Sequence, residues 1–319
     1  MDWRPTATRA ALARRAGILA QIRAHFTAAD VLEVDTPLLG LAGAGDPAIA
    51  SLEVDLHGST RFLQTSPEYA MKRLLAAGSG DVYQICKAFR DDEDGALHRP
   101  EFTLVEWYRL GFDHHALMDD VAALVGRVLP ALALERAAFA TLARRCGAPD
   151  PHAASTAELA AWAASLGFRT QADEATDRLL LLDLLLTEVV RRAWPSSQGR
   201  LEGGFVYDFP VEQAAYARLR PGSPRLASRF ELVIDGVELA NGWHEVTDGA
   251  TQRARHATEE AERRARGLPS RPPDPRLLAA LDHGLPDCAG VALGLDRLVM
   301  LAAGARTLEE VLAFGADWT

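Results

Sequence analysis

The feature that most constrains the fold of this 319-residue chain is a tight turn at Asp235-Gly236, between two apolar segments. An Asp-Gly pair adopts the positive backbone angles of a two-residue hairpin, so the flanking segments are predicted to be antiparallel strands over residues 228–246. The turn also fixes the register of the two strands. In that register Glu231 and Glu238 lie on one face as diagonal neighbours.

Two carboxylates placed in this way repel each other unless a cation lies between them. Mg²⁺ prefers oxygen ligands, so Glu231 and Glu238 are predicted to hold it. The alternative is a solvated polar face of an antiparallel sheet. Glu245 stands seven residues beyond Glu238, and this odd offset would place it on the opposite face. We predict a bulge at Asn241-Gly242 that returns Glu245 to the face of the pair.

Hairpins and helices follow one another along the whole chain, which predicts an α+β fold with an antiparallel sheet flanked by helices in a single domain over residues 1–319. The predicted order is a helix at 9–29, a strand at 31–34, a hairpin at 52–64, a helix from Ser66 to Ala77 with Ser66 as its N-cap, strands near 82–90 and 101–109, a mostly helical insertion at about 114–200, a strand at 204–209, the hairpin at 228–246, helices near 250–266 and 275–283, a strand at 291–295 and a helix from Asp296 to Ala303.

Composition and charge limit the class of protein. The chain has 48% hydrophobic and 24% charged residues, as is typical of a globular protein. Its formal net charge of −10 argues against a polyanion such as tRNA as the main ligand, because nucleic-acid-binding surfaces are basic. The three cysteines (Cys86, Cys146 and Cys288) have no metal-ligand spacing and predict free thiols. Neither a leader sequence nor an apolar run of about 20 residues is found, so a cytoplasmic location is expected.

Small residues alternate with aliphatic ones over residues 290–294, which gives the predicted strand one bare face. A bare face allows a flat ligand or a phosphate to approach the backbone. Asp296 is predicted to cap the following helix and to place Arg297 in its first turn, beside that face. The alternative is a glycine-rich strand packed on a helix, with Arg297 in solvent.

A second segment pairs an arginine with an aromatic ring across a charged loop. Arg90 ends one predicted strand and Phe102 begins the next. Arginine binds phosphate or carboxylate through two hydrogen bonds, and phenylalanine stacks on a purine. The alternative is an exposed acidic hairpin tip.

A third group suits an ammonium ligand. Glu106 and Tyr108 point to one face of their strand and could form an acidic pocket with Glu245, while Glu68 at the start of its helix could bind a second ammonium. The alternative places the aromatic residues at 107 and 108 simply in the core or at a sheet edge.

Taken in order, these segments resemble the three signature motifs of class II aminoacyl-tRNA synthetases, over nearly the whole chain. The first helix with VLEVDTP is similar to motif 1, FRDDE…HRPEFTLVEWY to motif 2 and GVALGLDRLVML to motif 3. TSPEYAMKRLL and ELANGWHEVTD resemble the lysyl branch more narrowly. The resemblance implies a class II catalytic domain and a homodimer through motif 1.

The chain resembles still more closely the elongation factor P lysine ligases, lysyl-tRNA synthetase paralogues without the anticodon-binding domain. Motif 1 begins within the first ten residues, and Ala292 stands where synthetases usually have glycine. The resemblance implies ATP- and Mg²⁺-dependent activation of (R)-β-lysine or lysine as an acyl-adenylate. It also implies transfer to a lysine side chain of elongation factor P, with no tRNA as partner.

The resemblance assigns roles residue by residue. The implied catalytic residues are Arg90 and Arg297; the implied amino-acid-binding residues are Ser66, Glu68, Glu106, Tyr108, Glu245 and Ala292; the implied metal ligands are Glu231 and Glu238; and the implied ATP-binding residues are Arg90, Asp91, Asp92, His98, Arg99, Phe102, Glu238, Leu239, Gly294 and Arg297.

Two positions depart from the family pattern: Asp92 stands where a glutamate is expected, and Arg99 replaces an asparagine. We expect the arginines, the carboxylate pair and the acidic pocket to open onto one cleft. Two alternatives share these residues in whole or in part. One is a truncated synthetase-like enzyme that acts on tRNA or a small amine, and the other is a non-catalytic regulatory paralogue. Because Arg90, Arg297, Glu231 and Glu238 are all present, the non-catalytic alternative is disfavoured.

Overall fold

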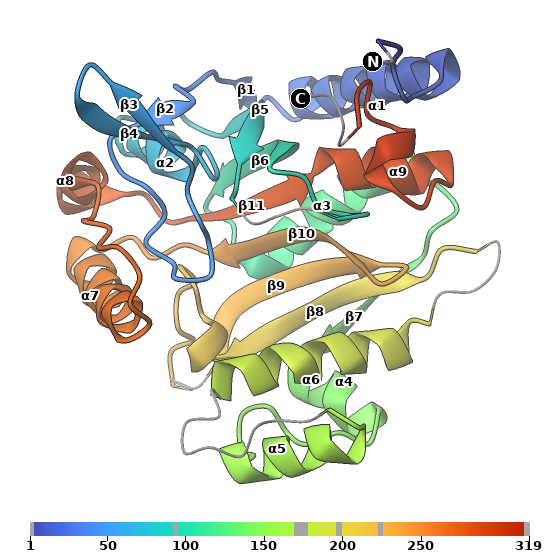
Figure 1. Ribbon diagram of the computed structural model, residues 1–319, viewed down its shortest axis with the longest axis vertical. Coiled ribbons are helices and arrows are strands. Elements are labelled where there is room, and N and C mark those ends of the chain that lie inside the picture. The colour runs from blue at the N-terminus through green and yellow to red at the C-terminus, as the bar shows by residue number, and fades with distance from the viewer. Residues whose placement is uncertain (1–2, 92–94, 169–177, 196–199, 223–225, 316–319) are drawn as a thin grey trace. The chain divides into compact units, whose positions relative to one another are not determined.

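The computed structural model describes residues 3–91, 95–168, 178–195, 200–222 and 226–315 (Figure 1). The chain divides into two compact units: unit 1 comprises Met1–Phe112 and Val246–Thr319, and unit 2 comprises Asp113–Glu245. Asp92 lies outside the described residues. The single domain predicted over residues 1–319 stays a prediction. Within the described residues, none of the helices combines the length and the apolar character needed to cross a membrane.

Unit 1 contains helices, four long or short strands that pair side by side, and a separate three-stranded sheet. Its elements are α1 (Arg9–Ala28), β1 (Leu32–Glu33), β2 (Leu39–Gly40), β3 (Glu53–Leu56), β4 (Ser59–Leu63), α2 (Glu68–Ala76), β5 (Val82–Phe89), β6 (Glu101–Leu110), α7 (Gly249–Ala265), α8 (Pro275–Gly284), β11 (Cys288–Gly294), α9 (Leu295–Ala303) and the 3₁₀ helix η2 (Leu308–Glu310). These bounds confirm the predicted elements of this unit to within a few residues.

Four strands of unit 1 pair in the order β1-β5-β6-β11, and a separate small sheet has the order β2-β4-β3. The long strands are antiparallel, and only β1 runs parallel to its neighbour β5. On β6, Phe102 is paired with Ala88 of β5, and Glu106 is paired with Ala292 of β11. The register of β6 therefore fixes which side chains of motifs 2 and 3 lie next to each other.

Most helix starts follow from local capping chemistry. The side chains of Thr8, Asp248 and Asp274 accept backbone N–H groups at the starts of α1, α7 and α8. The predicted Ser66 cap is wrong, because α2 begins one residue later with Pro67 as its N-cap. The Ser66 hydroxyl instead accepts the N–H of Glu68 at 3.1 Å and has a second role in the candidate site.

Unit 2 contains four further strands and the helices between Asp113 and Glu245. Its elements are α3 (His114–Val128), β7 (Leu134–Ala138), α4 (Phe139–Arg145), α5 (Thr156–Ser165), α6 (Arg178–Ala193), β8 (Gly203–Pro210), the 3₁₀ helix η1 (Val211–Gln213), β9 (Leu226–Ile234) and β10 (Val237–His244).

The strands of unit 2 follow the order β10-β9-β8-β7. The β9–β10 hairpin turns at Asp235-Gly236, where both residues have positive φ angles of 54° and 76°, as the sequence predicted. α3 packs against β9 and β10, and α4 packs against β7 and β8 (Figure 1). The strand β7 was not predicted within the helical insertion, because its sequence LERAA lacks the β-branched and aromatic residues typical of strands.

The core of unit 2 packs closely where β7 meets β8. A methyl group added at Gly204 would lie 2.5 Å from the Trp194 ring and 2.6 Å from the backbone oxygen of Glu135. Gly126 in α3 has no atom within 4 Å of the same position outside its own helix. These two glycines of one unit therefore meet opposite packing environments.

We expect Gly204→Ala to lower the free energy of unfolding by about 1–3 kcal/mol, because the new methyl group overpacks a position bounded by backbone. We expect Gly126→Ala to raise it by about 0.5–1 kcal/mol, because alanine loses less conformational entropy in a helix. Denaturant unfolding of both variants measures the difference. Equal stabilities would contradict the packing described for β7 and β8.

Candidate active site

Arg90 and Phe102 are brought together by the pairing of β5 with β6. The backbone N–H of Arg90 donates to the Pro100 carbonyl at 2.9 Å, which continues the ladder beyond the strand. The Arg90 guanidinium lies over the Phe102 ring, 5.2 Å from its centroid, at the distance of a cation–π contact. A purine can therefore stack on Phe102 only from the side away from Arg90. The neighbouring Asp91 donates its N–H to the Ala50 carbonyl at 2.9 Å.

Arg297 and His98 join motif 3 to motif 2, although they are 199 residues apart. Arg297 Nη2 lies 2.8 Å from His98 Nε2, and Arg297 Nε donates to the Leu97 carbonyl at 3.2 Å. A methyl group at Gly294 would have the Arg297 side chain as its nearest neighbour, at 3.5 Å. The predicted position of Arg297 beside the bare face of the strand is therefore confirmed.

The predicted capping role of Asp296 is wrong. Asp296 lies inside the first turn of α9, which has Gly294 as its N-cap. Its buried carboxylate accepts the backbone N–H of Thr103 at 2.8 Å and a bond from the Arg15 guanidinium at 2.6 Å. Asp296 thus ties α9 to β6 and α1, and it holds Arg297 in place through the backbone.

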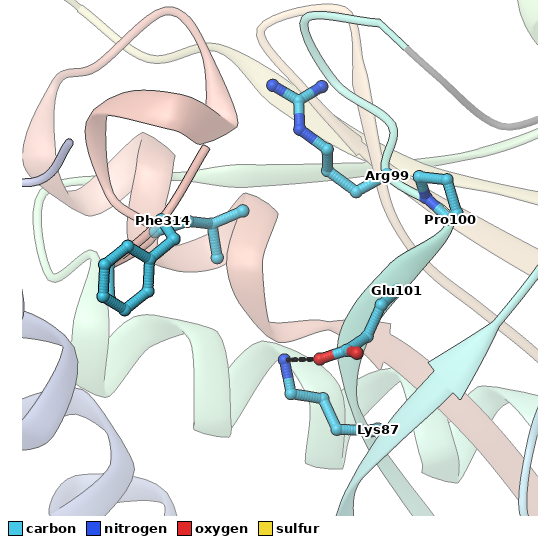
Figure 2. A pocket seen from close by; sticks show the side chains of 7 residues that line it. Lys87, Arg99, Pro100, Glu101 and Phe314 are labelled. Atoms are coloured by element: carbon cyan, nitrogen blue, oxygen red, sulfur yellow. Dashed lines mark ion pairs between the residues drawn. The ribbon is translucent and has the colours of Figure 1, made fainter. Parts of the chain in front are cut away.

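Arg99 lies at the edge of a pocket of about 240 Å³, which is shown in Figure 2. The pocket also contains the Lys87–Glu101 ion pair at 2.9 Å. The Arg99 guanidinium donates to the carbonyl groups of Gly95 and His98 and thereby supports the loop of motif 2. The pocket is smaller than ordinary ligand sites, so we do not assign ATP to it, and a contact of Arg99 with ATP stays a prediction.

Glu106 is the centre of a buried polar group in unit 1. Its carboxylate is 2% exposed and accepts one hydroxyl on each oxygen, from Ser66 at 2.7 Å and from Tyr108 at 2.8 Å. A carboxylate has about four acceptor positions, so a carboxylate that accepts hydroxyl groups can also accept an ammonium group. We call Ser66, Glu106 and Tyr108 the acidic socket.

Two further predicted residues lie near the acidic socket. Ala292 is directly opposite Glu106 in the register of β11 and β6, so their side chains share a face. Glu68 follows Ser66 at the start of α2, and its carboxylate pairs with the buried Lys72 ammonium at 2.5 Å. Glu68 therefore already has one cationic partner in the protein, which the sequence did not predict.

The predicted carboxylate pair lies on β9 and β10 of unit 2. Val233 is paired with Glu238, and Glu231 is paired with Asn241, so both glutamates share a face. Glu231 is buried and receives a bond from the Arg229 guanidinium, whereas Glu238 is exposed. The diagonal arrangement predicted from the turn is confirmed.

The predicted bulge exists, but two residues earlier than expected. The register shifts between Glu238 and Ala240, so the extra residue is Leu239, which is buried. The shift places residues 241, 243 and 245 on the face of the carboxylate pair. Glu245 is 1% exposed, and its carboxylate accepts the indole N–H of Trp243 at 2.9 Å.

The ionised form of Glu231 is disfavoured by its burial and by the nearby negative charge of Glu238. Burial first, and repulsion from Glu238 second, raise the pKa of Glu231 to about 8 against the opposing effect of Arg229. A divalent cation between the two carboxylates would relieve both causes. The donor set therefore fits Mg²⁺, which prefers carboxylate oxygen atoms.

Sequence reasoning missed two partners of this pair, Arg229 and Asn241. Arg229 Nε donates to the Asn241 side-chain oxygen at 3.1 Å, and Asn241 Nδ2 lies 3.5 Å from a Glu238 oxygen. The sequence contained the signal for Arg229. It stands two residues before Glu231 on the same strand, so its side chain points to the same face. Asn241 depended on the position of the bulge, which the turn does not fix.

The structure brings these residues together in two groups, each within its own unit. Unit 1 contains Arg90 with Phe102, Arg297 with His98, and the acidic socket. Unit 2 contains the carboxylate pair, Leu239 and Glu245. The convergence of both groups on one cleft stays a prediction.

Comparison with known proteins gives a match over almost the whole chain. The family model described as tRNA synthetases class II (D, K and N) matches residues 1–317. The chain is 45% identical over 319 residues to "Elongation factor P--(R)-beta-lysine ligase" of Vibrio cholerae serotype O1, which covers 98% of this chain and 97% of the relative.

Relatives of the same name occur in other bacteria. The Edwardsiella ictaluri and Klebsiella pneumoniae subsp. pneumoniae proteins are each 44% identical to the chain, over 322 and 321 residues, with 99% of this chain and 98% of each relative covered. The similarity is therefore spread over both units.

We expect Asp296→Ala to lower the free energy of unfolding by about 3–5 kcal/mol, because it leaves the Arg15 charge and the Thr103 N–H without their buried partner. Asp282→Ala is the matched control, since Asp282 pairs with Arg253 on the surface with half-exposed side chains, and such pairs contribute less than about 1 kcal/mol. Denaturant unfolding compares the two. Similar losses would contradict the role given to Asp296.

We expect the stability of the metal-free protein to fall as the pH rises from about 4.5 to about 8. In this range folded Glu231, with its raised pKa, keeps a proton that the unfolded chain has lost, and stability falls by up to about 1.4 kcal/mol per pH unit. Glu231→Gln should flatten this fall. Unfolding in a chelating buffer at several pH values tests the expectation, and identical pH profiles for both proteins would contradict it.

Proposed function

Because the chain belongs to the class II tRNA synthetases of the D, K and N type, we propose that it is an ATP-dependent ligase that activates (R)-β-lysine, or lysine, and transfers it to a lysine side chain of elongation factor P. The acidic socket carries the proposal. A buried carboxylate with a hydroxyl on each oxygen is suited to a substrate ammonium group. The relatives named for (R)-β-lysine ligation to elongation factor P, at about 45% identity, support the choice of substrate and acceptor.

In the first step, a carboxylate oxygen of the amino acid attacks the α-phosphorus of ATP, and the bond to pyrophosphate breaks. This forms an acyl-adenylate. The chemistry depends mainly on positioning and on stabilisation of charge. We assign Arg90 to the carboxylate and α-phosphate, and we assign Arg297 to the adenine face opposite Phe102 and to the γ-phosphate. His98 contacts Arg297 and is proposed to contact the phosphates with it.

Glu231 and Glu238 are proposed to hold Mg²⁺, which would neutralise the phosphate charge when bound. Asp91, Asp92, Arg99, Leu239 and Gly294 are proposed to contact the rest of ATP. The positions of Asp91 and Arg99 in motif 2, of Leu239 on β10 and of Gly294 at the end of β11 support this assignment.

The amino acid is proposed to bind through its amines. Glu106, Tyr108 and Glu245 take the side-chain ammonium, with Ser66 holding Glu106, and Glu68 takes the second amine. The Ala292 methyl shares the face of Glu106 and excludes one placement of that amine. A change of one methyl group contributes about 1–3 kcal/mol to such a choice, so it biases selection between isomers.

In the second step, a neutral lysine amine of elongation factor P attacks the carbonyl carbon of the adenylate, AMP leaves, and the amine nitrogen releases a proton. The product is an amide. We further propose that the enzyme is a homodimer that associates through the motif 1 helix, and that it acts in the cytoplasm.

We expect the wild-type protein to catalyse ATP–pyrophosphate exchange in the presence of (R)-β-lysine. We expect Arg90→Ala and Glu238→Gln each to lower the exchange rate at least about 100-fold, because each removes charge stabilisation of the transferring phosphate. Arg127→Ala, at an exposed helix position, and Glu262→Gln, at a partly exposed one, are the matched controls with full activity.

The substrate is tested with α-lysine and both β-lysine enantiomers, and the acceptor with elongation factor P and tRNA in parallel. Label transfer to tRNA but not to elongation factor P would favour a synthetase-like activity instead. Failure of exchange with every amino acid, while ATP still binds, would overturn the proposed activation.

A further inference from the structure

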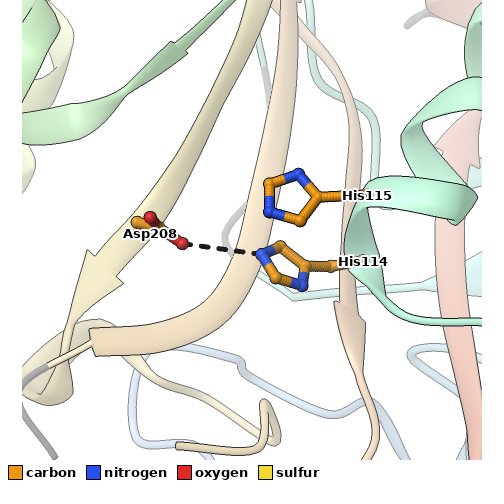
Figure 3. Close-up of side chains that lie close together, drawn as sticks. All are labelled: His114, His115 and Asp208. Carbon is orange, nitrogen blue, oxygen red and sulfur yellow. Dashed lines mark ion pairs between the residues drawn. The ribbon is translucent and has the colours of Figure 1, made fainter. Parts of the chain in front are cut away.

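Unit 2 holds a separate polar cluster that the proposed active site does not use. It consists of His114, His115 and Asp208 (Figure 3), and one donor atom from each side chain lies within 4.8 Å of the other two. His114 and His115 begin α3, and Asp208 lies in β8. Residues nearly 100 positions apart thus bring two imidazoles and a carboxylate to one point.

The backbone directs Asp208 toward the histidines. The pairing of β8 with β9 shifts register between Tyr207 and Phe209, where Asp208 alone stands opposite two residues of β9, Ser228 and Arg229. Its φ angle is +62°, an uncommon conformation for a residue with a side chain. A bulge bends the local ladder and can re-aim the side chains beside it, and here the residue opposite the bulge carries a buried carboxylate.

His114 is buried but poorly satisfied. It is 4% exposed, and its Nε2 lies 3.5 Å from Asp208 Oδ1, at the long limit of a hydrogen bond. Within the described part of the chain, neither ring nitrogen of His114 has a hydrogen-bond partner of normal geometry. Buried polar side chains nearly always have one, so this nitrogen pair is available to a ligand that accepts an electron pair.

His115 makes the cluster accessible from outside. Its side chain is exposed, and its ring lies 4.1 Å from the ring of His114. Rotation of an exposed imidazole can bring the three donor atoms to zinc–ligand distances of about 2.0–2.2 Å. The buried pair supplies rigidity, and His115 supplies the entry path.

We propose that His114, His115 and Asp208 form a Zn²⁺ site with three protein ligands and a water molecule in the fourth position. Two imidazoles and one carboxylate are a donor set that zinc accepts in tetrahedral geometry. The bound ion would join the start of α3 to β8 and would stabilise the folded state by mass action, because the unfolded chain does not assemble the three ligands.

Arg220 is the competing cation. Its guanidinium donates to Asp208 Oδ1, and its side chain is about one third exposed (34%). It can therefore move into solvent when a metal ion takes that oxygen. Removal of the Arg220 charge should therefore strengthen zinc binding, whereas removal of a ligand should weaken it.

The test is isothermal titration of the full-length, chelator-treated protein with ZnCl₂, together with the visible spectrum of the Co²⁺-loaded protein. We expect one Zn²⁺ per chain, a tetrahedral Co²⁺ spectrum and a higher unfolding temperature with zinc. His115→Ala, at an exposed position that should not disturb folding, should weaken binding by at least about tenfold. Arg220→Gln should bind zinc at least as tightly as the wild-type protein.

His283→Ala, an exposed histidine of unit 1, is the control for adventitious surface binding and should leave the affinity unchanged. Wild-type affinity in His115→Ala, or no stoichiometric binding in the wild-type protein, would overturn the site and leave the cluster as an ion-pair network. Because no residue of the activation chemistry is altered, the result is independent of the exchange assay.

Discussion

The antiparallel register of β6 between β5 and β11 is the constraint on which the candidate site of unit 1 depends. One continuous strand carries Phe102 at its start and Glu106 and Tyr108 near its end. Pairing with β5 places Arg90 over Phe102, and pairing with β11 places Ala292 beside Glu106. A slip of one residue would turn every one of these side chains to the other face. The buried Asp296 carboxylate also stabilises this register, because it accepts the backbone N–H of Thr103 on β6.

The two candidate groups carry charges opposite in sign to those of the proposed nucleotide and its metal ion. In unit 1 the cationic Arg297 guanidinium lies against the His98 ring. The guanidinium is suited to a phosphate group. In unit 2 the buried Glu231 carboxylate faces Glu238, and burial with repulsion raises its pKa, a state that a divalent cation would relieve. These opposite imbalances cost stability in the free protein, and the proposed nucleotide and metal ion would offset them. Marginal local stability of this kind is common at functional sites.

Backbone irregularities position the polar groups of unit 2. The bulge at Leu239 moves Glu245 onto the face of the carboxylate pair. A second irregularity, with its extra residue on β9, lies opposite Asp208, whose carboxylate is close to two histidines of α3. On β10 the inserted residue changes the parity of the strand that carries Glu245. On β8 no residue is inserted, and Asp208 instead has a positive φ of 62° opposite the bulge of β9. Both irregularities interrupt the pairing of β9 with a neighbouring strand, so the long hairpin organises two separate polar groups.

The sequence by itself determined most of the elements and the near neighbours along them. The Asp235-Gly236 turn fixed the diagonal Glu231–Glu238 pair, and motif spacing placed Arg90, Phe102, Glu106 and Arg297 on the right elements, because strand parity and turn chemistry are local. Only the tertiary structure decided the rest. It placed the bulge at Leu239 rather than at Asn241, gave Asp296 a lock across three elements instead of a cap, paired Glu68 with Lys72, and joined His114 and His115 to Asp208. These outcomes depend on which distant partner satisfies a buried polar group, and that choice is made by packing across the fold, where local patterns carry no information.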